Sequence, residues 1–143
     1  MRSVSALVPY PGGKMEPMTA TLTSTGSTAA VIVTHQRAEL LRASLAQVVH
    51  QTHPVQWVVV VDNGAEDAVR ELVESMAGDR GVYVPSETNL GGAGGFALGF
   101  LTALSLGADA VWCADDDGRP ADNTVLAELY RVAEANRLHE VSP

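Results

Sequence analysis

Short apolar runs alternate with segments of helical character along most of this chain. The apolar runs cover residues 29–33, 57–61, 82–84 and 111–114. A continuous apolar run between polar residues is typical of a strand buried on both faces of a parallel sheet. Apolar residues at helical spacing, or an almost wholly apolar stretch, predict helices at 40–49, 69–76, 96–106 and 125–132. This alternation predicts an α/β fold: a parallel sheet with alternating helices and right-handed crossovers.

Polar residues follow each predicted strand. Ligands of open parallel sheets bind beyond the carboxyl ends of the strands. Thr34 and His35, Asp62, residues 85–95 and residues 115–117 all fall at such ends. The carboxyl edge of the sheet is therefore where we expect the functional site.

Asp115, Asp116 and Asp117 form the most informative motif. Neighbouring ionised carboxylates repel one another, and a divalent cation relieves that repulsion. Hard oxygen ligands favour Mg²⁺ or Mn²⁺, which also bind substrate phosphates. The motif therefore favours a metal–phosphate site in which Asp115 and Asp117 form an Asp-x-Asp pair. The alternative is a turn followed by a helix N-terminus, since Asp is favoured in both.

Three other polar residues at this edge have two interpretations each. Asp62 can accept hydrogen bonds from a ribose hydroxyl or a base N–H, or it can form an Asx-turn in Asp-Asn-Gly. Arg37 can reach a nucleotide base or a phosphate, or it can be a solvated residue in the first turn of a helix. His35 can be a ligand or a general base, although a single His at a strand end is more often a polar loop residue.

Residues 89–95 form a glycine-rich segment ahead of the apolar helix, and we expect it to be a loop. Glycine lets a ligand approach the backbone closely, and a helix N-terminus favours anions. The alternative is that the glycines serve helix–sheet packing. The segment also matches the Gly-x-Gly-x-x-Gly/Ala pattern of dinucleotide binding. That pattern should directly follow the first strand of its domain, so dinucleotide binding ranks second.

Composition narrows the class of protein further. The chain has 143 residues, 46% of them apolar, and a net charge of −8. It is long enough for one domain, and its acidity argues against sequence-independent nucleic-acid binding. The single cysteine, Cys113, indicates a reducing compartment and a structural thiol. No apolar run reaches the ~18 residues of a membrane span, so we expect no transmembrane segment and a cytoplasmic location. Residues 1–28 are rich in Ser, Thr, Pro and Gly, and we expect a disordered leader there, with the domain at 29–143.

Taken together, these motifs resemble the family 2 glycosyltransferases, which have the GT-A fold. The resemblance rests on the runs from Val31 to Arg37, from Val60 to Asn63 and from Ala114 to Gly118. More narrowly, the segments 89–96, 112–118 and 140–143 are similar to the actinobacterial galactofuranosyltransferases that begin cell-wall galactan synthesis. The resemblance covers residues 29–143.

The resemblance implies a donor site for a UDP-sugar, UDP-galactofuranose in the narrower group. By this likeness Thr34, Arg37 and Asp62 line the uridine pocket, and Asp116 faces the donor sugar or ribose. Asp115 and Asp117 meet Mn²⁺ or Mg²⁺ and the diphosphate. The glycine-rich segment supports the donor site through three further residues, which are Asn89, Gly91 and Gly92. The implied acceptor is a polyprenyl-diphosphate-linked glycan, which would place the protein at the inner face of the plasma membrane.

Members of the family are about twice as long as this chain. Their second half supplies the catalytic Asp or Glu base, a further metal ligand and the acceptor cleft. We therefore expect an incomplete enzyme with no assignable catalytic residue, able to self-associate or to pair with a C-terminal half. A dinucleotide-binding (Rossmann) module and a non-catalytic interaction domain or pseudogene product are the alternatives. Binding of UDP with Mn²⁺, but not of NAD, would distinguish the donor-binding part of a glycosyltransferase from a dinucleotide-binding module.

Overall fold

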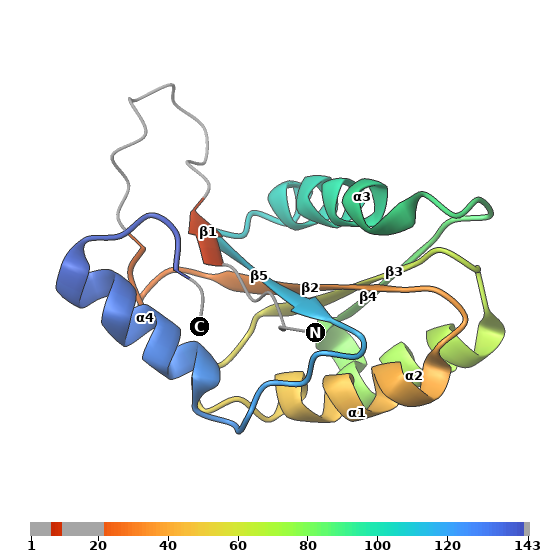
Figure 1. Cartoon of the computed structure of the whole chain (residues 1–143), viewed down its shortest axis with the longest axis horizontal. Helices are drawn as coiled ribbons and strands as arrows, with labels where there is room; N and C mark the ends of the chain where they lie inside the picture. The colour runs from red at the N-terminus through yellow and green to blue at the C-terminus, as the bar shows by residue number, and fades with distance from the viewer. Residues whose placement is uncertain (1–6, 10–21, 142–143) are drawn as a thin grey trace.

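The computed structural model describes residues 7–9 and 22–141 of the chain (Figure 1). Helices and strands alternate after the first two strands, as the apolar pattern predicts. The strands are β1 (Leu7–Pro9), β2 (Thr28–Thr34), β3 (Trp57–Asp62), β4 (Gly81–Pro85) and β5 (Ala110–Asp115). The helices are α1 (Ala38–Val49), α2 (Asp67–Ala77), α3 (Gly91–Ser105) and α4 (Val125–Asn136), with a 3₁₀ turn at Gly78–Arg80.

The strands form one sheet in the order β1-β5-β2-β3-β4. Strands β5, β2, β3 and β4 are parallel, and β1 pairs antiparallel with β5. The predicted α/β fold with a parallel sheet is therefore confirmed. The register sets Thr34 beside Asp62 and Val33 beside Asp115, so the carboxyl ends of the three central strands meet at one edge.

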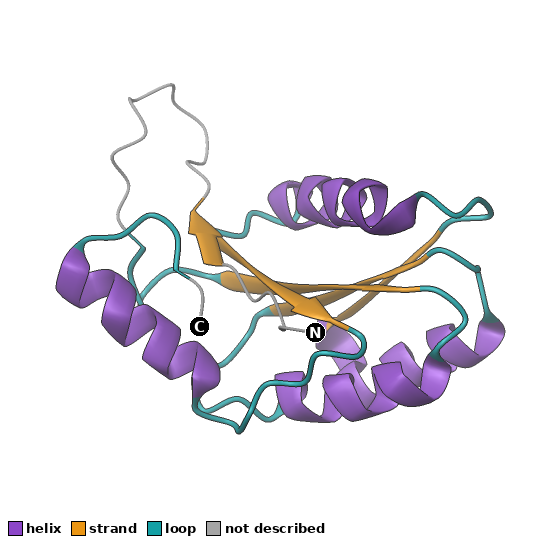
Figure 2. Ribbon diagram, viewed as in Figure 1, coloured by secondary structure: helices purple, strands orange, loops and turns teal. Residues whose placement is uncertain are grey.

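Helices cover the two faces of the sheet unequally (Figure 2). Helices α1, α2 and α4 lie on one face, where the larger core includes the fully buried side chains of Trp112 and Tyr130. Helix α3 covers the other face, where a smaller core forms over β2 and β3. Strands β2, β3 and β5 are buried on both faces, which explains their continuous apolar runs.

The glycine-rich segment is not the loop that we expected. Gly91 already begins α3, so the helix includes most of that segment. A Cβ on Gly95 would lie 2.5 Å from Cγ1 of Val33, and one on Gly99 would lie 2.3 Å from Cγ1 of Val31. These two glycines let α3 approach β2 closely, which is the packing alternative for this part of the motif. The weak helix propensity of glycine is overcome here by tertiary packing.

The expected disordered leader is wrong for the part of residues 1–28 that the structure describes. Leu7–Pro9 forms β1 on the edge of β5, and Leu22 is 2% exposed in the larger core. The remainder of the leader, residues 1–6 and 10–21, lies outside the described residues. Composition misses these contacts because an unpaired strand edge can accept almost any short extended segment.

Cys113 lies in β5 and is buried, as a structural thiol would be. Burial raises the pKa of this thiol to about 12, so it stays protonated at neutral pH. Among the described residues, no helix is both long and apolar enough to cross a bilayer.

Candidate functional site

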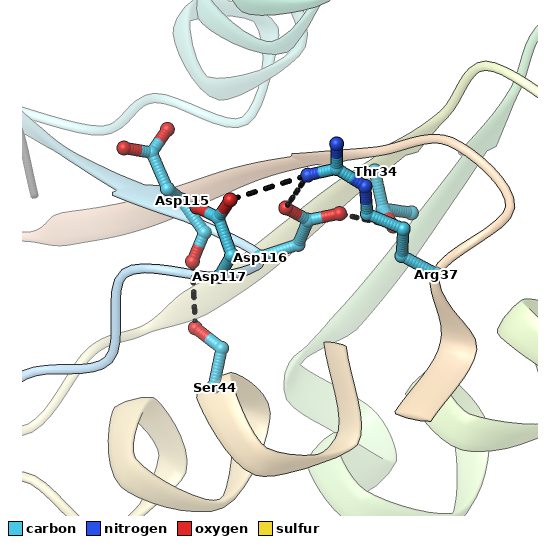
Figure 3. Close-up of polar contacts among 6 residues, drawn as sticks. All are labelled: Thr34, Arg37, Ser44, Asp115, Asp116 and Asp117. Carbon is cyan, nitrogen blue, oxygen red and sulfur yellow. Dashed lines mark hydrogen bonds and ion pairs between the residues drawn. The ribbon is translucent and has the colours of Figure 1, made fainter. Parts of the chain in front are cut away.

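Thr34, Arg37, Asp116 and Asp117 meet at the carboxyl ends of β2 and β5 (Figure 3). These strands are neighbours in the sheet, so residues far apart in sequence come together. The Thr34 hydroxyl donates a hydrogen bond to Oδ2 of Asp116 at 2.9 Å. One guanidinium nitrogen of Arg37 lies 3.4 Å from Oδ1 of Asp116 and 3.2 Å from Oδ2 of Asp117. The guanidinium therefore bridges two carboxylates of the aspartate motif.

The two bridged carboxylates differ in exposure. The Asp116 side chain is 8% exposed, whereas that of Asp117 is 42% exposed. Asp116 has both Thr34 and Arg37 as partners, and its position is fixed from two sides. Asp117 stands at the solvent side of the same group. The site thus offers one fixed and one accessible carboxylate to an incoming ligand.

Two polar residues that the sequence analysis did not single out hold the chain after β5: Ser44 contacts the aspartate motif, and Gln51 contacts the loop that leads to α4. The buried hydroxyl of Ser44 in α1 donates to the carbonyl oxygen of Asp115 at 2.9 Å (Figure 3). Gln51 donates through Nε2 to the carbonyl oxygen of Asp122 at 2.8 Å, and its Oε1 accepts from the backbone N–H of Leu126 at 2.9 Å. A polar residue on the apolar face of a predicted helix was the available signal for Ser44.

Asp62 at the end of β3 is in a different environment. Its side chain is fully buried and accepts hydrogen bonds from the backbone N–H groups of Gly64 at 2.9 Å and Glu66 at 2.6 Å. The hydroxyl of Tyr83 on β4 donates to the same carboxylate at 3.0 Å. Burial and this hydrogen bond raise the pKa of Tyr83 to about 12. The Asx-turn alternative therefore describes the contacts that Asp62 makes here.

Asn63 connects the end of β3 to the start of α3. Its side-chain amide donates to the carbonyl oxygen of Gly91 at 3.2 Å, and its Oδ1 accepts from the N–H of Leu90 at 3.3 Å. Oδ1 of Asn89 accepts from the N–H of Gly91 at 2.9 Å. Gly91 has a φ of +69°, which glycine adopts without strain. No heavy atom would meet a Cβ on Gly92 within 4 Å, so its surroundings do not explain that glycine.

The carboxylate of Asp115 does not join the Arg37 contacts, and it points away from the guanidinium (Figure 3). Within the described part of the chain, no three His, Cys, Asp or Glu side chains come together as a metal-binding group. The donor chemistry nevertheless fits Mg²⁺ or Mn²⁺. These ions need only one or two protein carboxylates when substrate phosphates and water complete the coordination. In the structure, the Arg37 guanidinium supplies positive charge to Asp116 and Asp117.

His35 contacts the backbone rather than another side chain of this group. Its Nδ1 lies 3.1 Å from the carbonyl oxygen of Asn63. This contact agrees with the interpretation of His35 as a polar loop residue. No catalytic base is assigned from the geometry of the described residues.

The fold is that of the GT-A glycosyltransferases. The crystal structure of S. aureus TarS residues 1–349 superimposes with a TM-score of 0.62 and 20% identity, over 76% of this chain and 32% of that one. The mannosyltransferase PcManGT from Pyrobaculum calidifontis, solved with GDP-Man and Mn²⁺, gives a TM-score of 0.57 and 23% identity. That match covers 79% of this chain and 34% of the mannosyltransferase.

The chain belongs to glycosyltransferase family 2, whose sequence profile, described as "Glycosyl transferase family 2", matches residues 29–141. Two similar proteins are galactofuranosyltransferases GlfT1. The one from Mycolicibacterium smegmatis is 53% identical over 122 residues, and the one from Mycobacterium tuberculosis is 52% identical over 121. The matches cover 85% and 83% of this chain but only 40% of each relative. The chain therefore spans about two fifths of the length of these relatives.

Proposed function

We propose that this chain is the donor-binding part of a galactofuranosyltransferase that uses UDP-galactofuranose and a divalent cation, Mn²⁺ or Mg²⁺. The observation that carries the proposal is the group at the ends of β2 and β5, where Arg37 bridges two carboxylates of the aspartate motif. The 53% identity with a galactofuranosyltransferase over 122 residues supports the choice of sugar. The proposed acceptor is a polyprenyl-diphosphate-linked glycan, which would bring the protein to the inner face of the plasma membrane.

In this proposal, Asp115 and Asp117 hold the cation together with the diphosphate of the donor. When bound, the cation would neutralise the negative charge of the leaving diphosphate. Asp116 is held by Thr34 and Arg37 at a fixed position beside that site, suited to a hydroxyl of the donor sugar or ribose. Asp116 can orient the donor, because the Thr34 hydroxyl fixes its position before the donor arrives.

The remaining proposed donor residues contribute in different ways. Thr34 and Arg37 would border the uridine pocket at the end of β2. Asp62 is buried and already accepts three hydrogen bonds, so we propose that it shapes this pocket mainly through the turn that it holds. Asn89, Gly91 and Gly92 precede or begin α3 and would support the donor from the other side.

The proposal assigns the acceptor-activating base to a part of the relatives that this chain does not match. Inverting transfer requires a base within hydrogen-bond reach of the acceptor hydroxyl. We therefore expect no product from UDP-galactofuranose and a lipid-linked acceptor with the 143-residue chain alone, and product only when a polypeptide supplying the remainder docks. Turnover by the chain alone would contradict this assignment, and His35 would then be the first residue to mutate.

Calorimetric titration with UDP tests the donor site directly. UDP should bind more tightly with Mn²⁺ than without it, and Asp117→Asn should remove most of that gain. Asp79→Asn is a matched control, because Asp79 lies in the 3₁₀ turn at Gly78–Arg80, after α2. Equal affinity for UDP with and without Mn²⁺ in the unmodified chain would overturn the metal assignment.

Dinucleotide binding remains the second candidate, and the glycine-rich segment is the observation for it. The structure sets this segment after β4, which lies at one edge of the sheet, rather than after the first strand of the domain. Gly95 is also accounted for by its contact with Val33. Titration with NAD in place of UDP should show no binding, and tight NAD binding would favour the alternative.

A further inference from the structure

We propose that Arg37 acts as an exchangeable counter-cation: it neutralises Asp117 while the donor site is empty and releases it when metal and diphosphate bind. The freed guanidinium then pairs with the anionic donor. This inference rests on the proposed function, because it assigns to one residue the coupling between metal and nucleotide at the same site. In this inference Arg37 changes partners when the donor binds, instead of keeping one position at the border of the uridine pocket.

The first support is that the two carboxylates paired with Arg37 differ in burial and in their other partners. Asp116 is nearly buried, and the Thr34 hydroxyl would continue to hold it if Arg37 moved away. Asp117 and Arg37 are both about half exposed, at 42% and 52%. Exposed ion pairs contribute little free energy because water solvates the separated charges well. The Arg37–Asp117 contact is therefore the part of this group that can be exchanged.

The second support is the position of Arg37 at the start of α1. Arg37 is the N-cap residue of this helix, and its side chain makes no capping hydrogen bond. The N-terminus of a helix carries a partial positive charge, so a cationic side chain is disfavoured there unless an anion balances it. The two aspartates supply that anion in the structure. A bound diphosphate would supply it equally well, since a guanidinium pairs with phosphate through parallel hydrogen bonds.

The third support is that Arg37 and a metal ion would compete for the carboxylate oxygens of Asp117. A divalent cation on Asp117 requires the carboxylate to turn its lone pairs toward the metal, and the Arg37 hydrogen bond uses one of those oxygens. A guanidinium and a metal ion bound to the same carboxylate also repel each other. Metal binding without nucleotide should therefore be held back by Arg37, whereas metal and nucleotide together should be favoured, because the displaced guanidinium gains a new anion.

The test compares Arg37→Gln with Arg42→Gln, using Mn²⁺ alone, UDP alone and both together in calorimetric titrations. Arg42 is the matched control, because it lies on α1, is 56% exposed and pairs with the exposed Glu39 rather than with the aspartate motif. Arg37→Gln should tighten the binding of Mn²⁺ alone by about two- to fivefold, the range expected from loss of an exposed ion pair. The same variant should weaken the binding of UDP in the presence of Mn²⁺ and reduce the mutual enhancement between the two ligands.

A second variant keeps the inference open to refutation if Arg37→Gln does not fold. Arg37→Lys retains a positive charge but loses the planar fork. It should bind Mn²⁺ alone as the unmodified chain does, and it should bind UDP with Mn²⁺ more weakly. Thermal melting without ligands shows whether each variant is folded.

The outcomes separate this inference from the proposed function. If the unmodified chain does not bind UDP with Mn²⁺, the proposed function fails, whatever Arg37 does. If it binds both ligands and Arg37→Gln behaves like Arg42→Gln, the donor site stands and the exchange is wrong. Weaker binding of Mn²⁺ alone by Arg37→Gln would also overturn the exchange, because it would make Arg37 a support of the metal site.

Discussion

Two groups of carboxylates stand at the same edge of the sheet, and they are used differently. Asp62 ends β3, is fully buried and accepts three hydrogen bonds from the protein. Asp117 follows β5, is 42% exposed and pairs with the half-exposed Arg37. Asp62 is the last residue of β3, whereas Asp117 lies two residues beyond Asp115, the last residue of β5. A carboxylate at this edge of the sheet is therefore a candidate ligand only where the surrounding chain leaves its oxygens accessible.

Replacing Asp62 should give the largest loss of stability. Asp62→Ala leaves two backbone N–H groups and the Tyr83 hydroxyl without their acceptor, which should cost about 3 kcal/mol in the free energy of unfolding. Urea denaturation measures the loss. Asp67→Asn, on the exposed start of α2, is the control and should change stability by less than about 1 kcal/mol. A loss below about 1 kcal/mol for Asp62→Ala would mean that the fold depends on Asp62 no more than on the exposed Asp117.

Ser44→Ala should give the next largest loss of stability, and this loss arises at the aspartate motif. The variant removes the buried hydroxyl that donates to the carbonyl oxygen of Asp115, at an expected cost of about 1–2 kcal/mol. It should also weaken the binding of UDP with Mn²⁺, since the segment that carries Asp115 and Asp117 is then less firmly placed. Ser75→Ala in α2 is the control, because that hydroxyl bonds only within its own helix. Equal UDP affinities for both variants would show that Ser44 serves stability alone.

Tyr83→Phe should cost about 1 kcal/mol, because one hydrogen bond to Asp62 is lost while two remain. The pKa of Tyr83 gives a pH test of the same contact. The folded-state pKa is raised to about 12 from an ordinary value of 10, so the folded protein holds this proton more tightly than the unfolded chain. The resulting stability is fully present below pH 10 and is lost as the pH rises toward 12. Burial also raises the pKa of Tyr130, so ultraviolet titration should show both Tyr83 and Tyr130 ionising late, and the loss of one late transition in Tyr83→Phe would identify Tyr83.

Asp117→Asn should have the smallest effect on folding. The ion pair with Arg37 is exposed, so the free energy of unfolding should change by less than about 1 kcal/mol in urea denaturation. The same substitution should remove most of the gain in UDP affinity that Mn²⁺ provides. A loss of more than about 2 kcal/mol would mean that the fold uses Asp117 as fully as it uses Asp62.

Much of the fold could be predicted from local pattern. The runs at 29–33, 57–61, 82–84 and 111–114 all lie within observed strands, because buried parallel strands leave a continuous apolar signature. The helices were correct in number and type, although α3 begins five residues earlier than expected. That error came from reading glycines as loop formers, whereas Gly95 and Gly99 are needed for close helix–sheet contact. The pairing of Leu7–Pro9 with β5 had no local signal.

Local pattern is enough to predict the alternation of strands and helices, the polar residues at the strand ends, and the aspartate motif on which the resemblance to family 2 rests. These are properties of neighbouring residues, and periodicity records them directly. Tertiary contacts place β2 between β3 and β5, which brings Thr34 and Arg37 to Asp116. The same packing enclosed Asp62 and left Asp117 accessible. Strand order and burial depend on contacts between distant segments, and no local pattern contains them.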